Sequence, residues 1–223
     1  MKNLISSQRP YYIHSSLLFK LFAMIKVFLK QYQLKIPILI TKRLVMKPFK
    51  SEHSLGLFEL LSSAEVCKYS GSAYDLVGKP IQLPAQTTSD SDKVLDFFIQ
   101  HQSRSVRFRW AILSKSNNEF LGAIGFNSLG ACSEIAYHLI PRFCGQGFMA
   151  EACKEAIHWV NASFGSTSIE AFIDFENISS IKLVKKLNFK ATGESNDGAD
   201  RYLHDIKFNK SYEKDFFHLD IEA

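Results

Sequence analysis

The chain has 223 residues, of which 46% are hydrophobic and 22% charged, a composition typical of a globular protein rather than a disordered one. This length fits one ordinary domain with some extra chain, and it can bury a sizeable core. The net charge of +5 is unevenly distributed, because residues 1–50 contain ten Lys and Arg and no acid, whereas the remainder contains 17 basic and 22 acidic residues. This mildly acidic body argues against a nucleic-acid-binding protein and is weakly compatible with a cationic substrate.

Residues 1–36 differ from the rest of the chain. Lysines interrupt their apolar stretch at 17–30, so no uncharged run reaches the roughly 18 residues that span a bilayer, and no small-residue cleavage site follows. One interpretation of the segment is a basic amphipathic helix in peripheral contact with a membrane or a partner. The alternatives are an extension packed on the domain and an over-long gene start, with Met24 as the alternative first residue. Without a credible export signal, we expect a cytoplasmic location.

The cysteines and histidines favour neither a disulfide framework nor a metal site. The four cysteines form no C-x-x-C pair, and we expect free thiols in a reducing compartment, buried as small apolar side chains. The histidines show no ligand-like spacing with acids or cysteines, so we predict no metal. These residues are Cys67, Cys132, Cys144 and Cys153, and His14, His53, His101, His138, His158, His204 and His218.

From Ile38 onward, hydrophobic patterns predict an ordered succession of strands and helices. A strand is expected at 38–48, and Ser51 is expected to cap a helix at 51–62 whose apolar positions are Leu55, Phe58 and Leu61. A long surface loop at 70–92 can shape the mouth of a substrate site, and a helix follows from about 90 to 103.

The second half begins with strands and then changes period. Strands are expected at 108–113, 120–128 and 134–140, with connections short enough for antiparallel hairpins. A helix follows, with Met149, Ala152, Cys153, Ala156 and Val160 on one face. A strand at 168–175, a helix at 179–187 and two strands at 189–192 and 202–208 complete the series, which predicts a mixed α/β sheet.

The junction between the strand at 134–140 and the following helix is the sharpest feature. Arg142-x-x-Gly145-x-Gly147 leads into the helix, so backbone N–H groups can turn toward one point where the helix dipole is positive. A pyrophosphate suits such a cradle, although two glycines before a helix can also be only a tight turn. The turn lacks both the Lys-Ser/Thr of a Walker A loop and the G-x-G-x-x-G of dinucleotide binders.

A second element begins at Asn177, which is suited to capping a helix or to gripping a ligand amide. Its helix ends at Asn188, a residue type that tolerates the left-handed conformation used at helix ends.

In this order and about 30 residues apart, the two elements resemble the GNAT superfamily of acyl-CoA N-acyltransferases. Within it, the chain is similar to the branch of bacterial ribosomal-protein N-terminal (Ala/Ser) acetyltransferases. The resemblance covers about 38–210, and the matching stretches are 41–48, 120–125, 134–152 and 177–189. It implies a single α/β (α+β) domain at 37–210, with a mixed, mostly antiparallel sheet flanked by helices, between an extension at 1–36 and a tail at 211–223.

The resemblance also implies the residues that bind acetyl-CoA. Arg142 and Ser180 are among the implied cofactor-binding residues. Backbone N–H groups would hold the pyrophosphate, and they belong to Cys144, Gly145, Gln146, Gly147 and Phe148. The strand end near Leu139 would pair with the pantetheine arm. Backbone near Tyr137 would polarise the acetyl carbonyl, and Asn177 would contact the pantetheine.

In this family a primary amine, here a protein N-terminus or a small amine, attacks the thioester directly. Many members protonate the leaving thiolate with a Tyr seven residues after the Asn, where this chain has Val184. In the branch that this chain resembles, the Ser three residues after the Asn is the proposed substitute, which implies Ser180 as the acid, with a simple helix-start role as its alternative. Glu134 is the candidate base, ahead of His138; both belong to one face of the strand, and each can instead be structural or solvated.

Two residues depart from the branch: Cys144 replaces a large aromatic and Asn188 replaces the commoner Gly, but neither change removes a backbone donor. Val184 also stands where many members of the superfamily have the Tyr. The missing Tyr permits a catalytically weak CoA-binding module that acts at a membrane or partner through residues 1–36. A nucleotide-binding protein is the least favoured hypothesis. The protein is expected to be a monomer or a homodimer.

Overall fold

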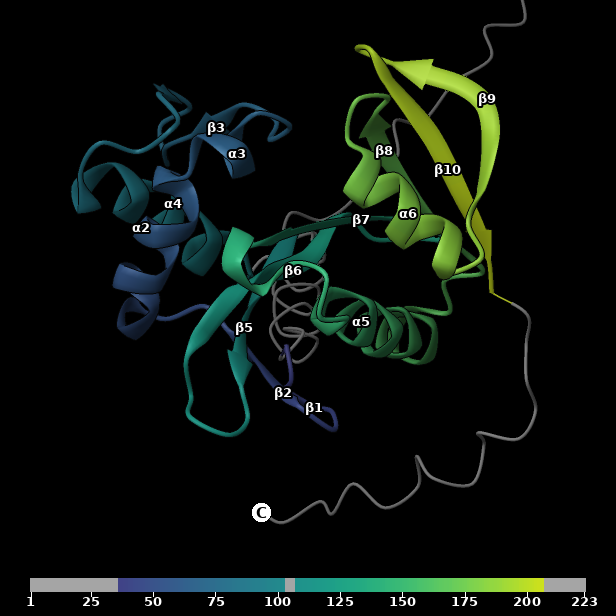
Figure 1. Cartoon of the computed structure of the whole chain (residues 1–223), viewed down its shortest axis with the longest axis horizontal. Coiled ribbons are helices and arrows are strands. Elements are labelled where there is room, and N and C mark those ends of the chain that lie inside the picture. Colours follow the sequence, from purple (N-terminus) through teal and green to yellow (C-terminus); the bar gives the residue numbers. More distant parts are fainter. Residues whose placement is uncertain (1–35, 103–106, 207–223) are drawn as a thin grey trace, which may run out of the picture. The chain divides into compact units, whose positions relative to one another are not determined.

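The computed structural model describes residues 36–102 and 107–206, so the interpretations of the extension and of the tail at 211–223 lie outside the described residues, apart from residue 36. The main sheet has eight strands in the order β1-β2-β5-β6-β7-β8-β10-β9, and β3 and β4 form a second, two-stranded sheet (Figure 1). Within the main sheet, β7 and β8 pair in parallel and all other neighbours are antiparallel. This is the mixed, mostly antiparallel sheet flanked by helices that the sequence predicts.

The strands are β1 Leu39–Ile40, β2 Leu44–Pro48, β3 Ala73–Tyr74, β4 Pro80–Ile81, β5 Phe108–Ser114, β6 Phe120–Ser128, β7 Cys132–Leu139, β8 Ser168–Asp174, β9 Lys190–Asn196 and β10 Ala199–Asp205. The helices are η1 Ser51–His53, α2 Ser54–Ser62, α3 Ala64–Cys67, α4 Thr88–Gln102, η2 Pro141–Phe143, α5 Phe148–Phe164 and α6 Ile178–Lys186.

Helix α5 covers one face of the central strands, which we call the α5 face. The five apolar positions predicted for this helix are all buried, as expected from their i, i+3, i+4 spacing. Trp159 of α5 packs edge-on against Phe108 and Trp110 of β5, with ring centroids 5.4 Å and 5.0 Å apart. Large rings arranged edge-to-face bury much apolar area in a favourable geometry, so this cluster anchors α5 to the sheet.

Helices α2 and α4 pack against each other and cover the opposite face, which we call the α2 face (Figure 1). Its core contains Phe49, Leu57, Leu60 and Leu61 from the α2 region and Val94 and Leu95 from α4. The prediction that Leu55 faces the core is wrong, because its side chain is 76% exposed and the helix instead buries Leu57, Leu60 and Leu61.

The predicted first strand at 38–48 is instead a hairpin of β1 and β2, with Leu39 opposite Met46. The turn between them is held by the Thr41 hydroxyl, which accepts a hydrogen bond from Leu44 N at 3.0 Å and donates to Glu151 Oε1 at 2.6 Å. Because Glu151 lies more than 100 residues away, the β-branched pattern of the segment could not reveal this break.

The predicted Ser51 cap is also wrong. Ser51 begins the 3₁₀ turn η1, and α2 starts only at Ser54. The imidazole of His53 accepts the Lys50 N–H at 3.0 Å, the role that Glu or Gln fills at the third helical position of a capping box.

The other boundaries differ less. The predicted loop at 70–92 contains the β3–β4 hairpin, and α4 begins at Thr88. The short α3 was not predicted, and the 3₁₀ turn η2 separates β7 from α5. The predicted last two strands pair as β9 and β10, and residues 207 and 208 of that prediction lie outside the described part.

Within residues 36–102 and 107–206, no helix combines the length and the apolar character needed to cross a membrane.

Candidate active site

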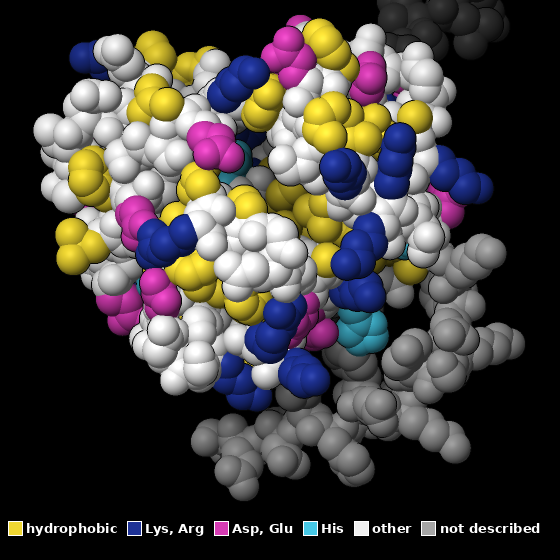
Figure 2. All heavy atoms as spheres, in the orientation of Figure 1, with side chains coloured by type: hydrophobic (Ala, Val, Ile, Leu, Met, Phe, Trp, Pro, Cys, Tyr) yellow, Lys and Arg dark blue, Asp and Glu magenta, His cyan; other side chains and the backbone are white. Residues whose placement is uncertain are grey.

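The central feature of the site is an opening between β7 and β8. The two strands pair only from Cys132 with Ser168 to Glu134 with Glu170, and beyond this point β7 pairs with β6 and β8 pairs with β10. The inner edges of residues 135–139 and 171–174 therefore lack a strand partner. Figure 2 shows this side of the protein hollowed between the half that contains α2–α4 and the half that contains α6 and β8–β10. An extended ligand can enter such an opening and pair with a free strand edge.

The glycine turn lies where β7 ends and α5 begins. Gly145 and Gly147 have φ of +76° and +80°, a left-handed conformation that side chains with a Cβ rarely adopt, and Gly147 is the N-cap of α5. The N–H groups of Gly145, Gln146 and Gly147 have no acceptor within the described part of the chain, whereas Cys144 N donates to Pro141 O at 3.0 Å. The helix N-terminus therefore has one free N–H group fewer than the sequence predicts. The remaining N–H groups can still bind an anion.

Arg43 of the β1–β2 region holds this turn in place. Its guanidinium pairs with Glu151 of α5 at 2.7 Å, donates to Gln146 O at 2.9 Å and lies 4.4 Å from the centroid of the Phe148 ring. Because one side chain joins the β1–β2 hairpin, the turn and the first turn of α5, the donors are fixed before a ligand arrives. Such preorganisation reduces the entropic cost of binding.

The side chain of Arg142, one of the predicted cofactor-binding residues, pairs with two carboxylates. Its guanidinium pairs with Glu59 of α2 and with Glu119, the latter at 3.0 Å, and it lies over the ring of Phe143. In this arrangement the side chain joins the glycine turn to the α2 face. A direct role for its charge in anion binding would require these two carboxylates to be released.

Glu134 of β7 ends a chain of polar contacts on the α2 face. Its carboxylate accepts from Asn127 Nδ2 at 2.6 Å, and Asn127 Oδ1 in turn accepts from Arg109. Arg109 is buried, donates to Phe108 O at 2.9 Å and lies over the Phe98 ring of α4. Burial, and then the charge of Arg107, lowers the pKa of Arg109 to about 10, so the guanidinium stays charged at neutral pH.

His138 lies on the same face as Glu134, as the strand alternation predicts. The hydroxyl of Ser70 donates to Val66 O at 2.9 Å, so its oxygen accepts from Nε2 of His138 at 3.1 Å. This assigns the imidazole proton to Nε2 and leaves Nδ1 as an acceptor. Burial, and secondarily the charge of Arg109, lowers the pKa of His138 to about 4, so the ring is neutral at pH 7.

Asn177 and Ser180 lie at the start of α6, across the opening from β7. Asn177 is the N-cap, and its Oδ1 accepts from Ser180 N at 3.1 Å, which is the capping role that its residue type suggests. Asn188, after the helix, has a φ of 63°, the left-handed conformation expected there.

Tyr137 of β7 points to the opposite face from Glu134 and His138. Its buried hydroxyl lies close to Ser180 without a hydrogen bond, since Tyr137 Oη has no partner in the described part of the chain. Burial raises the pKa of the phenol, and a smaller effect of Ser180 opposes this rise, so Tyr137 remains protonated. Two hydroxyls therefore adjoin the same end of α6, beside the buried Val184.

A family model described as an acetyltransferase (GNAT) domain matches residues 43–190. The chain belongs to this family. It is therefore an acetyltransferase enzyme that uses acetyl-CoA as its acetyl donor.

Two relatives in Bacillus share much of this GNAT chain. The uncharacterized N-acetyltransferase p20 of Bacillus licheniformis is 29% identical over 158 residues, which cover 70% of this chain and 83% of p20. The uncharacterized N-acetyltransferase YoaA of Bacillus subtilis is 24% identical over 160 residues, or 70% and 85% of the two chains. Among solved structures, RimL, a ribosomal L7/L12 alpha-N-protein acetyltransferase in complex with coenzyme A, matches with a TM-score of 0.62. The alignment is 18% identical and covers 76% of this chain and 97% of RimL, so this likeness concerns the fold.

Several contacts of this GNAT site were missed by the sequence analysis. Arg109, Asn127 and Ser70 surround Glu134 and His138, and Arg43 and Glu151 brace the glycine turn. One signal was available, because Arg109 interrupts the otherwise apolar run of β5 between Phe108 and Trp110. Within residues 36–102 and 107–206, no group of three or more His, Cys, Asp and Glu side chains is placed to hold a metal ion.

Proposed function

We propose that this enzyme transfers the acetyl group of acetyl-CoA to a primary amine that attacks the thioester directly. The observation that supports this mechanism best is the opening between β7 and β8, which has a glycine turn with free N–H groups at one end and Glu134 near the other. The amine nitrogen forms a bond to the acetyl carbon, the carbon–sulfur bond breaks, and CoA leaves as a thiolate that takes up a proton.

The donor is proposed to bind along β7. The pyrophosphate would accept hydrogen bonds from the N–H groups of Gly145, Gln146 and Gly147 and from the first turn of α5 at Phe148. The pantetheine arm would pair with the free edge of β7 near Leu139, with Asn177 on the other side. A backbone N–H near Tyr137 would polarise the acetyl carbonyl and stabilise the negative charge that develops on its oxygen.

Glu134 is proposed as the base that removes the proton from the attacking ammonium. Asn127 fixes one carboxylate oxygen, which leaves the other oxygen to accept a proton directly or through water. The neutral His138 has an acceptor at Nδ1, but a pKa of about 4 makes it a weak base, so we assign it a positioning role.

Ser180 is proposed as the group that returns a proton to the leaving thiolate. It lies in the first turn of α6, where the helix dipole also stabilises a nearby negative charge. Val184 is buried and cannot supply a proton. The phenol of Tyr137 lies close to Ser180 and stays protonated, so it can restore the proton of the serine.

The acceptor is proposed to be a protein N-terminus or a small amine that enters from the α2 face. The RimL enzyme, which shares the fold, is named for acting on a ribosomal protein N-terminus. We also propose a cytoplasmic location, which the four free cysteines support, since thiols persist in reducing compartments.

The test combines isothermal titration of the full chain with acetyl-CoA and thiol release against a panel of amines and N-terminal peptides. We expect micromolar binding and thiol release with at least one acceptor. Gly147→Glu should abolish binding while circular dichroism shows an unchanged fold, because the side chain adds strain at a φ of +80° and negative charge at the cradle. Lys42→Glu, an exposed charge change in the β1–β2 turn, is the matched control and should bind normally.

The outcomes separate the alternatives. Binding without thiol release for any acceptor would favour the weakly catalytic CoA-binding module. Unchanged acetyl-CoA affinity in Gly147→Glu would show that the glycine turn is structural and would refute the proposed donor site.

A further inference from the structure

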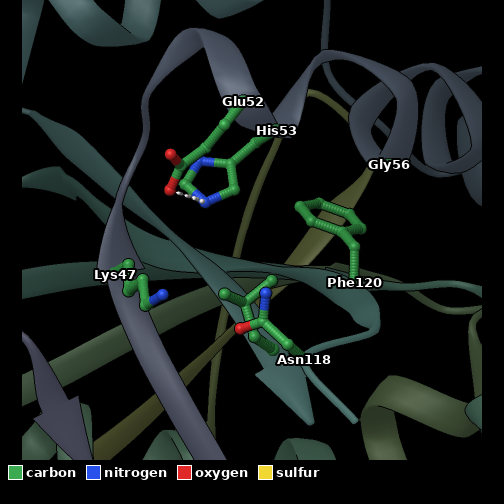
Figure 3. A pocket seen from close by; sticks show the side chains of 7 residues that line it. Lys47, Glu52, His53, Gly56, Asn118 and Phe120 are labelled. Carbon is green, nitrogen blue, oxygen red and sulfur yellow. Dashed lines mark ion pairs between the residues drawn. The ribbon is translucent and has the colours of Figure 1, made fainter.

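A cavity of about 380 Å³ lies on the α2 face, near strands β2 and β5 (Figure 3). None of the residues proposed to act in acetyl transfer lines it. Its volume falls within the range of small-molecule sites and exceeds the space of a few water molecules. It is lined by Lys47, Glu52, His53, Gly56, Leu113, Asn118 and Phe120.

The aromatic wall of this cavity depends on two local features. The pairing of β5 with β6 moves from Ile112–Gly122 to Leu113–Phe120, so Leu121 is an extra residue that turns Phe120 toward the α2 face. Gly56 of α2 lets the Phe120 ring lie directly against the helix backbone, where a Cβ would collide with it. A glycine inside a helix is destabilising relative to alanine, and the close approach of Phe120 offsets this cost.

His53 supplies a donor that lacks an acceptor. Its Nδ1 accepts the Lys50 N–H at 3.0 Å, which requires the proton of the neutral ring to be on Nε2. The side chain is only 4% exposed, and Nε2 has no hydrogen-bond partner in the described part of the chain. Glu52 makes only a long ion-pair contact with Nε2, at 3.6 Å, which Figure 3 marks with a dashed line and which exceeds hydrogen-bond distance. A buried N–H group without an acceptor is costly, so its presence indicates a missing acceptor.

Two further donors face the same space. Figure 3 shows the Lys47 ammonium and the Asn118 side chain below the imidazole ring, both directed toward the cavity. Asn118 is fixed in the β5–β6 turn with a φ of 58°. Lys50 adds a second positive charge that acts on His53, whereas the opposing Glu52 is 59% exposed and well solvated. The donors and the balance of charge favour a ligand with negatively charged oxygen atoms.

We propose that this cavity is a second ligand site, separate from the acetyl-transfer site, and that it binds a small carboxylate or phosphate. One ligand oxygen accepts from Nε2 of His53, and the others accept from Lys47 and Asn118. Phe120 and Leu113 provide an apolar wall for the remainder of the ligand.

The test uses the full chain labelled with ¹⁵N and follows the His53 imidazole and the Asn118 backbone amide by NMR. Sodium phosphate and sodium acetate are titrated separately at constant ionic strength, with sodium chloride as the blank. We expect saturable shifts of both signals with at least one oxyanion. A response to phosphate alone or to acetate alone identifies which source of the oxyanion the site prefers.

Two variants and one control make the test specific. Lys47→Met removes a donor, and His53→Asn keeps a side-chain acceptor for Lys50 N–H while removing Nε2. Each variant should raise the Kd obtained from the Asn118 shift at least tenfold, whereas the exposed Lys42→Met should leave this Kd unchanged. His53→Asn is interpreted only if its amide spectrum remains folded, and Lys47→Met stands without it.

Three results would overturn the proposal: no saturable shift with either oxyanion, equal affinity in Lys47→Met and Lys42→Met, or complete loss of the shift when acetyl-CoA saturates the enzyme. The last result would mean that the anion occupies the donor site. The NMR titration does not measure acetyl transfer. Its result would therefore stand even if the acetyl-transfer proposal failed.

Discussion

The two faces of the central sheet use the same strands for different purposes. On the α5 face, β5 contributes Phe108 and Trp110, which are fully buried against Trp159. On the α2 face, the residue between them is the buried Arg109, whose contacts lead through Asn127 to Glu134. One strand thus carries apolar anchors and a buried charge at alternate positions.

This difference indicates where stability and chemistry lie. The α5 face buries apolar side chains and contributes stability by removing them from water. The α2 face holds a buried cation and a neutral histidine, groups that cost free energy unless they are paired or uncharged. We therefore expect substitutions in the aromatic cluster of the α5 face to affect stability mainly, and substitutions of the polar residues around Glu134 on the α2 face to affect turnover and pH dependence mainly.

The largest expected effect is on stability. Trp159→Ala removes the ring that joins α5 to Phe108 and Trp110, and we expect it to lower the free energy of unfolding by about 3–5 kcal/mol. Urea denaturation followed by fluorescence measures this change. Trp159→Phe, which keeps an aromatic ring, should lose less than half as much. If the alanine variant were as stable as the wild type, the α5 face would not be the anchor of the fold.

The α5 face was also the more predictable of the two. The spacing of Met149, Ala152 and Ala156 gives the helix and its buried side, and the paired glycines before it give its N-terminus. These signals are local, since they depend on residues within a few turns of one another. The same holds for the cap at Asn177 and the left-handed Asn188.

The α2 face depends on contacts that the sequence pattern does not contain. The environment of His138 depends on Ser70, 68 residues earlier in the chain, and Arg109 reaches Glu134 only through Asn127. The β3–β4 hairpin and α3 lie in a segment rich in turn residues, where periodicity gives no signal. The sequence could therefore nominate Glu134 but could not reveal its connection to Arg109.

The next effect concerns turnover. Glu134→Gln keeps an oxygen for Asn127 but removes the proposed base, and we expect kcat to fall about 100- to 1000-fold with a change of less than about 1 kcal/mol in unfolding free energy. Thiol release at saturating acetyl-CoA measures kcat. Glu170→Gln is the control, because Glu170 is the neighbour of Glu134 on β8.

A result in which both variants lose activity equally would point to a general effect of charge in the opening. A stable Glu134→Gln with normal kcat would remove Glu134 from the mechanism.

A smaller effect should appear in the pH dependence of stability. His138 has a pKa of about 4 in the folded protein and about 6.5 as a free side chain, so only the unfolded chain takes up a proton between these values. The contribution of His138 to the free energy of unfolding should therefore be constant above pH 6.5. As the pH drops toward 4, this contribution should fall by on the order of 2 kcal/mol.

Denaturant unfolding at pH 7 and pH 4.5 measures this loss. His138→Gln should reduce the difference between the two pH values, and His204→Gln should not. His53, whose pKa burial also lowers, contributes a loss of the same sign that remains in both variants. An unchanged pH difference in His138→Gln would mean that the ring is more solvated than its contacts indicate.

The smallest effect concerns protonation of the leaving group at the N-terminal end of α6. Ser180→Ala keeps the N–H that Asn177 caps but removes the proposed acid, and we expect kcat to fall about tenfold, since a thiolate is a moderately good leaving group. Tyr137→Phe should cost less, because the phenol acts through Ser180. The double variant should resemble Ser180→Ala alone, which is the non-additivity expected of two groups in one proton path. Additive losses would instead assign Tyr137 an independent role, and the hydroxyl on the α5 side of β7 would then belong to the chemistry as much as Glu134 does.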